Sequence, residues 1–265
     1  MPKTSKRQKK SASFKLKSRP RTKSARRLSH INKRHVPLKR SSTSLHVSRS
    51  KIKDKVLFEL EHYPQTEEFT SSAACAMMVL KHLNTNFKMK KEEEYSIWQE
   101  AVNGSVWHGS KYGLAYSIAK RGSGAKVSIL SNTKEEGYDR KLAVYENVNL
   151  DTLTASYNET KAKAESANVC EEYSSNISLN SIKRALSSNQ IPIVLIDANA
   201  LNPYLESSPH WIVVKGYDKD AFYINDPYSD STITLDHDAF RQSLGYDNNF
   251  HMVLTDTRRK NRPKR

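Results

Sequence analysis

Basic residues are concentrated at the start of the chain, and this limits where a folded core can form. Residues 1–55 contain 20 Lys and Arg residues and a single acid, Asp54, with few apolar residues among them. Such a segment cannot bury enough apolar surface to offset the entropy lost on ordering, and its charges repel one another. We therefore expect residues 1–55 to be a disordered basic tail.

The rest of the chain has the opposite charge balance. Residues 56–257 carry 18 basic and 27 acidic residues, and residues 258–265 add six basic ones. The sequence thus predicts one acidic domain at 56–257 between the first tail and a second basic tail at 258–265. Each Lys or Arg that neutralises a phosphate releases a counterion, so the tail at 1–55 is a candidate for contact with a polyanion such as nucleic acid. A tail with no specific partner is the alternative.

The sequence also argues against several classes of protein. No apolar run approaches the roughly 18 residues that span a bilayer, and no apolar stretch follows the basic start, so we expect neither a membrane span nor a secretory signal. Two cysteines cannot form a disulfide framework, and no Cys-x-x-Cys pair indicates zinc. We expect a cytoplasmic protein with no metal and no cofactor.

The spacing of apolar residues changes along the acidic domain. Residues 73–83 (AACAMMVLKHL) are apolar on nearly all sides, which is typical of a buried helix. Strands are expected at 56–61, where apolar residues alternate, and at 126–130. Further helices are expected at 89–103, 109–121 and 178–189, and a weak helical signal covers 133–169.

From residue 191 onward the pattern has the period of a sheet. It predicts strands at 191–197, 210–217, 221–224, 232–235 and 252–255, with a short helix at 236–244. Helices that precede an antiparallel sheet indicate an α+β fold.

Four polar residues in this layout are candidates for a catalytic site. Ser71 stands at the entrance of the buried helix, where its N–H and the positive helix end would stabilise an oxyanion, and Gln65, six residues earlier, could supply a second donor. His210 opens an apolar strand, and Asp226 follows 16 residues later. A hairpin would bring these two side chains to one end of the sheet, where Asp226 could hold the imidazole in one tautomer.

These segments resemble the C39-like peptidases of the papain-like superfold. The resemblance is carried by Gln65-x5-Ser71, AACAMMVLKHL and HWIVVKGYDKDAFYINDP, and it covers nearly all of 56–257. It implies a papain-like α+β domain, with a helical N-terminal part followed by an antiparallel sheet. It also implies a Cys nucleophile, a His base, an orienting Asp and a Gln oxyanion donor. In this sequence those roles fall on Ser71, His210, Asp226 and Gln65.

The chain departs from the family at the nucleophile. The family pattern reads Thr-Cys-Gly-Pro-Ala, whereas residues 70–74 read Thr-Ser-Ser-Ala-Ala. A Cys beside a His can ionise before it attacks, but a Ser must lose its proton as it attacks. We therefore favour a homologue that binds a peptide in the family's groove without cutting it. The alternatives are an active serine hydrolase that uses Ser71, His210 and Asp226, and a nucleic-acid- or ribosome-associated protein tethered by its basic tails.

Nearby residues have less specific interpretations. Cys75 lies one turn deeper on the same helix and is expected to be a core cysteine rather than a substitute nucleophile. By the same resemblance, His108, Tyr112 and Gly113 lie close to the groove wall.

Overall fold

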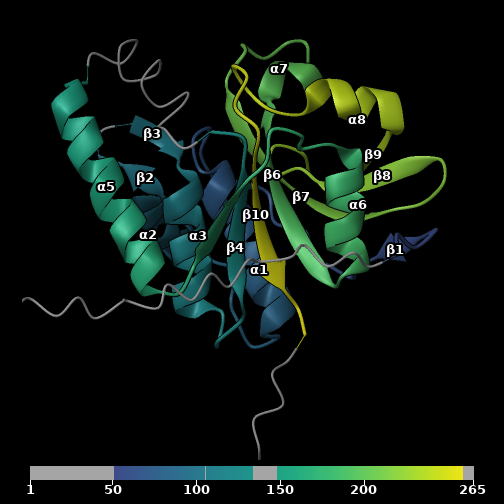
Figure 1. Ribbon diagram of the computed structural model, residues 1–265, viewed down its shortest axis with the longest axis horizontal. Helices are drawn as coiled ribbons and strands as arrows, with labels where there is room; N and C mark the ends of the chain where they lie inside the picture. Colours follow the sequence, from purple (N-terminus) through teal and green to yellow (C-terminus); the bar gives the residue numbers. More distant parts are fainter. Residues whose placement is uncertain (1–50, 105, 134–147, 259–265) are drawn as a thin grey trace, which may run out of the picture. The chain divides into compact units, whose positions relative to one another are not determined.

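The computed structural model of the protein describes residues 51–104, 106–133 and 148–258 (Figure 1). Most of the two basic tails therefore lies outside the described residues. Residues 134–147, which belong to the segment with a weak helical signal, lie outside them too. No helix in the described part of the chain is long and apolar enough to cross a membrane.

Most of the helical residues precede the central strands. The first group of helices is α1 (Ser71–Leu83), α2 (Lys91–Ala101), α3 (Lys111–Arg121) and α5 (Leu150–Ser166), and the later ones are α6 (Leu179–Ser187), α7 (Ala198–Leu201) and α8 (His237–Ser243). Every residue of α1 from Ser71 to Leu80 is buried, as its apolar sequence predicts. Ser178 caps α6 in a capping box, which confirms that start signal.

The strands form one large sheet and a small ribbon. The sheet consists of β1 (Val56–Leu57), β4 (Val127–Ser131), β5 (Cys170–Tyr173), β6 (Gln190–Asp197), β7 (Pro209–Tyr217), β8 (Ala221–Asn225), β9 (Thr232–Asp236) and β10 (His251–Asp256). Their order is β5-β4-β10-β6-β7-β8-β9, with β1 paired to β7. All of these pairs are antiparallel except β4 with β5. The ribbon joins β2 (Val102–Asn103) to β3 (Val106–Gly109).

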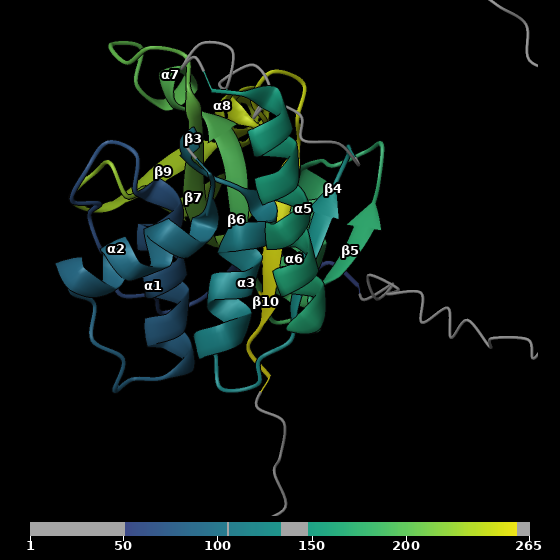
Figure 2. The same cartoon turned by 90° about the vertical axis from the view of Figure 1, so that its left-hand side faces the viewer.

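Both faces of the central strands are covered. Figure 1 shows α1, α2, α3 and α5 on one side of the sheet and α6 and α8 on the other, and Figure 2 gives the view from the first side. Along β6, Ile193 and Leu195 join the core under the first group of helices, while Val194 and Ile196 join the core under α6 and α8. Burial on both faces explains why 191–196 is apolar throughout instead of alternating.

The α+β prediction is confirmed, with local differences. The predicted strand at 56–61 is paired only over Val56–Leu57. β2, β3, β5 and α7 were not expected, and each is only two to four residues long. Such short elements carry little periodicity of their own. The three strands form by pairing with neighbouring strands, and α7 begins where the Asp197 side chain caps it.

Candidate active site

Ser71 begins α1 and lies against the start of β7. Its side chain is almost fully buried, and its Oγ accepts a hydrogen bond from the backbone N–H of Trp211 at 3.3 Å. Trp211 directly follows His210, so this bond links the helix start to the strand that carries the histidine. Two residues in different halves of the sequence are thereby brought to one place.

His210 and Asp226 form a buried pair. The predicted hairpin is β7 with β8, and the His210 Nε2 lies 2.7 Å from the Asp226 Oδ1. The same carboxylate oxygen accepts the backbone N–H of Tyr228 at 2.9 Å. Burial raises the pKa of Asp226, but the hydrogen bond and charge of His210, with smaller contributions from Tyr228 and His62, outweigh it and hold that pKa below its usual value. The carboxylate therefore stays ionised beside the imidazole.

Gln65 reaches the same region through its backbone. Its N–H donates to the carbonyl of Pro227 at 2.8 Å, next to Asp226. Its side-chain Nε2 donates to the carbonyls of Glu67 and Glu68 at 3.0 and 3.1 Å, which uses both amide hydrogens. Within the described residues, then, the amide is bonded to its own loop and makes no hydrogen bond with Ser71.

Two further histidines border the pair. The His62 Nε2 lies 3.0 Å from the Asp226 carbonyl oxygen. His108, at the end of β3, is hydrogen-bonded to the carbonyl of Pro209, and burial together with the charge of His210 lowers its pKa to about 4. Sequence reasoning placed His108 only near a groove wall, and it did not single out His62 at all. No local signal marks either one, since both approach through tertiary packing.

The other residues near the predicted site lie in the core. Tyr112 is 2 % exposed, and its hydroxyl donates to Glu171. A Cβ on Gly113 would come within 2.6 Å of the Ala101 Cα, so this glycine permits α2 and α3 to pack closely. The Cys75 thiol donates to the Trp211 carbonyl at 3.2 Å, and burial raises its pKa well above the usual value. Cys75 is a buried neutral thiol.

The surface near the four predicted site residues has two different parts. A hollow of about 280 Å³ next to Gln65 is lined by Pro64, Gln65, Thr66, Glu67, Glu68, Pro227, Tyr228 and Asp230. On the side of β3, the rings of Phe69, Trp98 and Trp107 contact one another, with centroids 4.8–6.4 Å apart. Trp107 is 54 % exposed, which leaves its indole open to solvent.

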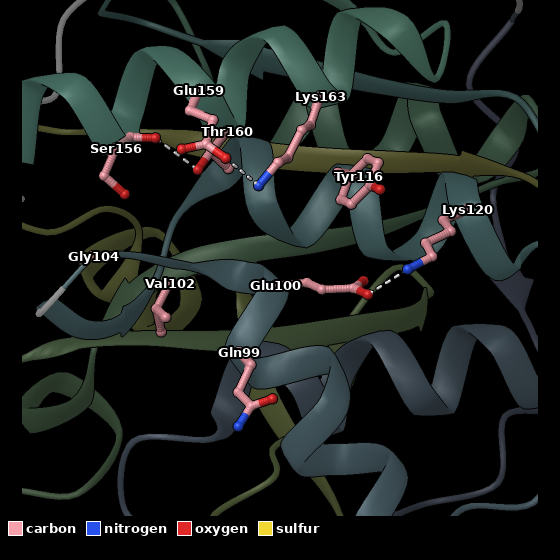
Figure 3. A pocket seen from close by; sticks show the side chains of 10 residues that line it. All are labelled: Gln99, Glu100, Val102, Gly104, Tyr116, Lys120, Ser156, Glu159, Thr160 and Lys163. Carbon is pink, nitrogen blue, oxygen red and sulfur yellow. Dashed lines mark hydrogen bonds and ion pairs between the residues drawn. The ribbon is translucent and has the colours of Figure 1, made fainter.

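A larger hollow of about 420 Å³ lies among α2, α3 and α5 (Figure 3). Its charged side chains are already paired, Lys120 with Glu100 at 2.6 Å and Lys163 with Glu159 at 2.7 Å. None of the four predicted site residues lines it. In the part of the chain that the structure describes, no group of His, Cys, Asp and Glu could hold a metal ion.

Comparison with known proteins agrees with the sequence resemblance. A family model described as a Peptidase_C39 like family matches residues 60–253, which is more than half of the chain. Among solved structures, a Bacillus anthracis protein assigned as a C39-like peptidase matches with 13% identity and a TM-score of 0.45, over 78% of this chain and 100% of that one. No curated protein matches the sequence.

Proposed function

The chain belongs to the Peptidase C39-like family, and we propose that it binds peptides at the surface around Ser71, His210 and Asp226 without hydrolysing them. In this proposal Ser71 stands where the family's nucleophilic cysteine would be. The protein keeps the fold and the histidine–aspartate pair of a peptidase and lacks a reactive thiol at the helix start.

The observation that carries the proposal is the hydrogen bonding of Ser71. Its Oγ accepts the Trp211 N–H, and within the described residues it makes no hydrogen bond with His210. A serine becomes nucleophilic only when a base removes its proton during attack, so a hydroxyl that is not bonded to the base is poorly prepared for hydrolysis.

The engaged amide of Gln65 supports the same proposal. Acyl transfer needs donors aimed at the developing oxyanion, and loss of one such donor costs about 100- to 1,000-fold in rate. Both amide hydrogens of Gln65 already go to the carbonyls of Glu67 and Glu68. The backbone N–H at the start of α1 would then be left as the main oxyanion donor.

The test restores the thiol in the full-length chain, with Cys170→Ser in every protein so that the exposed Cys170 thiol does not react with the probes. Ser71→Cys is treated with a peptidyl vinyl sulfone and with iodoacetamide, and adducts are followed by intact mass. The wild-type chain is treated in parallel with a fluorophosphonate. His210→Ala is combined with each form as the matched control, because it removes the base and leaves residue 71 unchanged.

We expect Ser71→Cys to react with the peptidyl probe in a His210-dependent manner and the wild type to remain unlabelled by the fluorophosphonate. A His210-dependent fluorophosphonate adduct on Ser71 would instead establish an active serine hydrolase that uses Ser71, His210 and Asp226. If the peptidyl probe did not label Ser71→Cys although iodoacetamide did, the peptide-binding proposal would be wrong.

The basic tail supports a second proposal, contact with a polyanion. Residues 1–55 hold 20 basic side chains and one acid. If about six to ten of them neutralise phosphates, affinity for a nucleic acid should fall about 10³- to 10⁵-fold between 50 and 200 mM salt. Deleting residues 1–50 should remove this binding in a filter assay, while deletion of 259–265 should weaken it only partly. Binding that survives the first deletion would contradict this proposal.

The proposed cellular location is the cytoplasm. Both cysteines in the described part of the chain are free thiols, Cys75 buried and Cys170 exposed. An exposed free thiol is more typical of a reducing compartment than of an oxidising one.

A further inference from the structure

The large sheet has two edge strands, and they differ in how they are protected. The strand order places β5 at one end and β9 at the other, and Figure 2 shows them at opposite margins of the sheet. An edge strand presents backbone N–H and C=O groups to other chains, and proteins block such pairing with charges, prolines or bulges. β5 reads Cys-Glu-Glu-Tyr and carries two adjacent acids. β9 reads Thr-Ile-Thr-Leu-Asp, with no proline, no charge before its last residue and no bulge in its register with β8.

The two faces of β9 differ in polarity. Ile233 and Leu235 are half-buried and pack against the core under α6 and α8. Thr232, Thr234 and Asp236 are exposed on the other face. Among the strands of the described residues, β8 alone pairs with β9. A further strand at this edge would therefore both pair with the backbone of β9 and cover the exposed part of its apolar side chains.

We propose that β9 pairs with β9 of a second copy of this chain, antiparallel and around a two-fold axis at Thr234. The two large sheets then form one continuous sheet. This surface is separate from the surface around Ser71, His210 and Asp226, so the inference does not depend on the proposed function.

The sequence of β9 is self-complementary in this register. A two-fold axis at Thr234 sets this residue opposite its own copy. Ile233 then faces Leu235 of the second copy, on the core side of both sheets, and Thr232 faces Asp236 of the second copy on the other side. All five residues of β9 are paired, and no two like charges meet. An axis at Asp236 would instead set two acids against each other, which is destabilising.

A lysine beside Thr232 makes the charges complementary as well. The Lys215 Nζ donates to the Thr232 Oγ1 at 3.4 Å. Because Thr232 faces Asp236 of the second copy, Lys215 of each copy would lie beside the Asp236 carboxylate of the other. The Asp236 Oδ1 caps α8 by accepting the N–H groups of Asp238 and Ala239 at 2.9 and 2.8 Å. Its second carboxylate oxygen can accept from the lysine.

We expect a dimer whose population depends on protein concentration. A pair of five-residue strands buries less than the roughly 1,200–2,000 Å² of a stable interface. The test is sedimentation velocity of the full-length chain over a range of concentrations. Nuclease treatment comes first, so that nucleic acid bound to the basic tails does not link two copies. The wild type should change from monomer to dimer as its concentration rises.

Charge substitutions at the two-fold axis test the register. Thr234→Lys and Thr234→Glu should each be monomeric where the wild type is dimeric, because two like charges would then face each other. An equimolar mixture of the two variants should form dimers again, because a lysine then faces a glutamate. This recovery would also show that both variants fold. Thr234→Val, which keeps the shape of the side chain and adds no charge, should dimerise like the wild type.

Disulfide trapping measures the same contact directly. Thr234→Cys is oxidised in the full-length chain with Cys170→Ser, which removes the other exposed thiol. Residues directly opposite in an antiparallel pair have Cα atoms about 4.5–5.5 Å apart, within reach of a disulfide. Ser231→Cys is the matched control, since residue 231 is also exposed but would lie roughly 20 Å from its own copy. The covalent dimer should form far faster through residue 234.

Three results would overturn the inference. One is a wild type that stays monomeric at every concentration. Another is a dimer that persists in both Thr234→Lys and Thr234→Glu. The third is a disulfide that forms as readily through Ser231→Cys as through Thr234→Cys, because the two copies would then meet elsewhere or without a fixed register.

Discussion

Two groups of buried side chains in this protein each combine a serine, a histidine and a carboxylate, and they differ in what faces the histidine. The site cluster consists of Ser71, His210 and Asp226. The core cluster consists of Ser131, His251, Lys111 and Glu171. In the core cluster the Ser131 Oγ lies 2.9 Å from the His251 Nδ1, a direct contact that Ser71 and His210 lack within the described residues.

The core cluster is nevertheless arranged for stability. Lys111 is 3 % exposed and lies 2.7 Å from Glu171 and 2.9 Å from the Ser131 hydroxyl. Tyr112 and Tyr173 both donate to the Glu171 carboxylate. Burial, and then the charge of Lys111, lower the pKa of His251 to about 3. The carboxylate is occupied and the histidine faces a cation, so this ring cannot take up a proton from Ser131.

The site cluster has the reverse arrangement. The carboxylate of Asp226 faces His210 directly, and a carboxylate in that place stabilises the proton that an imidazole accepts during catalysis. The comparison teaches that a short serine–histidine distance is a poor sign of a nucleophile. A nucleophile needs that contact together with a carboxylate, rather than a cation, beside the histidine.

The largest expected effect is on the core cluster. Lys111→Met should lower the free energy of unfolding by about 3–5 kcal/mol, because it leaves the largely buried Glu171 carboxylate without its cation. Urea unfolding of the full-length chain measures this loss. The control is Lys91→Met, which removes the exposed partner of Glu67 and should hardly move the midpoint. Similar losses in the two variants would remove the contrast between buried and exposed pairs.

A second test separates the two histidines by reactivity. In Ser71→Cys with Cys170→Ser, which removes the other exposed thiol, changing Asp226→Asn should slow iodoacetamide alkylation at pH 7 about 100-fold, because His210 loses the carboxylate that orients it. His251→Gln in the same background should leave the rate unchanged. If both changes slowed alkylation to the same extent, the proposed difference between the site cluster and the core cluster would be wrong.

A third test concerns the contact between Gly109 in β3 and Ser72 in α1, next to Ser71 of the site cluster. Gly109→Ala should cost about 1–3 kcal/mol, because the new Cβ would lie 2.0 Å from the Ser72 Oγ and 2.4 Å from the Ser72 Cβ. Adding Ser72→Gly should recover most of that loss, whereas adding Ser72→Ala should not, since the Cβ remains. Thermal or urea unfolding of the wild type, the three single variants and the two double variants gives the coupling. Additive effects would mean that β3 and α1 do not meet as described.

The smallest effect is a difference in pH dependence. The folded pKa of His251, about 3, lies below its unfolded value near 6.5, so the unfolded chain binds the proton first and stability falls as pH drops from 6.5 towards 3. His108, with a pKa of about 4, acts in the same direction down to that pH. Each contributes up to about 1.4 kcal/mol per pH unit.

Urea unfolding gives the free energy of unfolding at each pH between 6.5 and 4.5. Plotted against pH, this free energy should have a shallower slope in His251→Gln than in the wild type, and the difference should correspond to about one bound proton. The slope of Lys91→Met serves as the reference, because that change leaves both histidines intact. An unchanged slope in His251→Gln would show that this ring titrates normally in the folded protein.

Much of the fold follows from the sequence because burial leaves a strong local pattern. The all-round apolar sequence of α1 and the continuous apolar run of β6 both reflect burial on every side, and both elements form where predicted. The helix α6 begins at its predicted cap. The elements that sequence reasoning missed, β2, β3 and β5, are short and depend on neighbours for their pairing.

The candidate site was predictable to a smaller extent. Hairpin reasoning brings His210 and Asp226 together, and the structure has them 2.7 Å apart; their catalytic role stays a prediction. The bonding of the Gln65 amide to its own loop and the approach of His108 had no sequence signal. Both depend on how separate segments pack, and no residue spacing encodes that.

By itself, the sequence determined the charge division of the chain, the change from helices to strands, and the residue types available at positions 71, 210 and 226. Only the tertiary structure decided which serine and histidine touch and which carboxylate faces a histidine. The physical reason is that apolar periodicity is a local consequence of burial, whereas the protonation and hydrogen bonding of a buried group depend on every charge and donor packed around it.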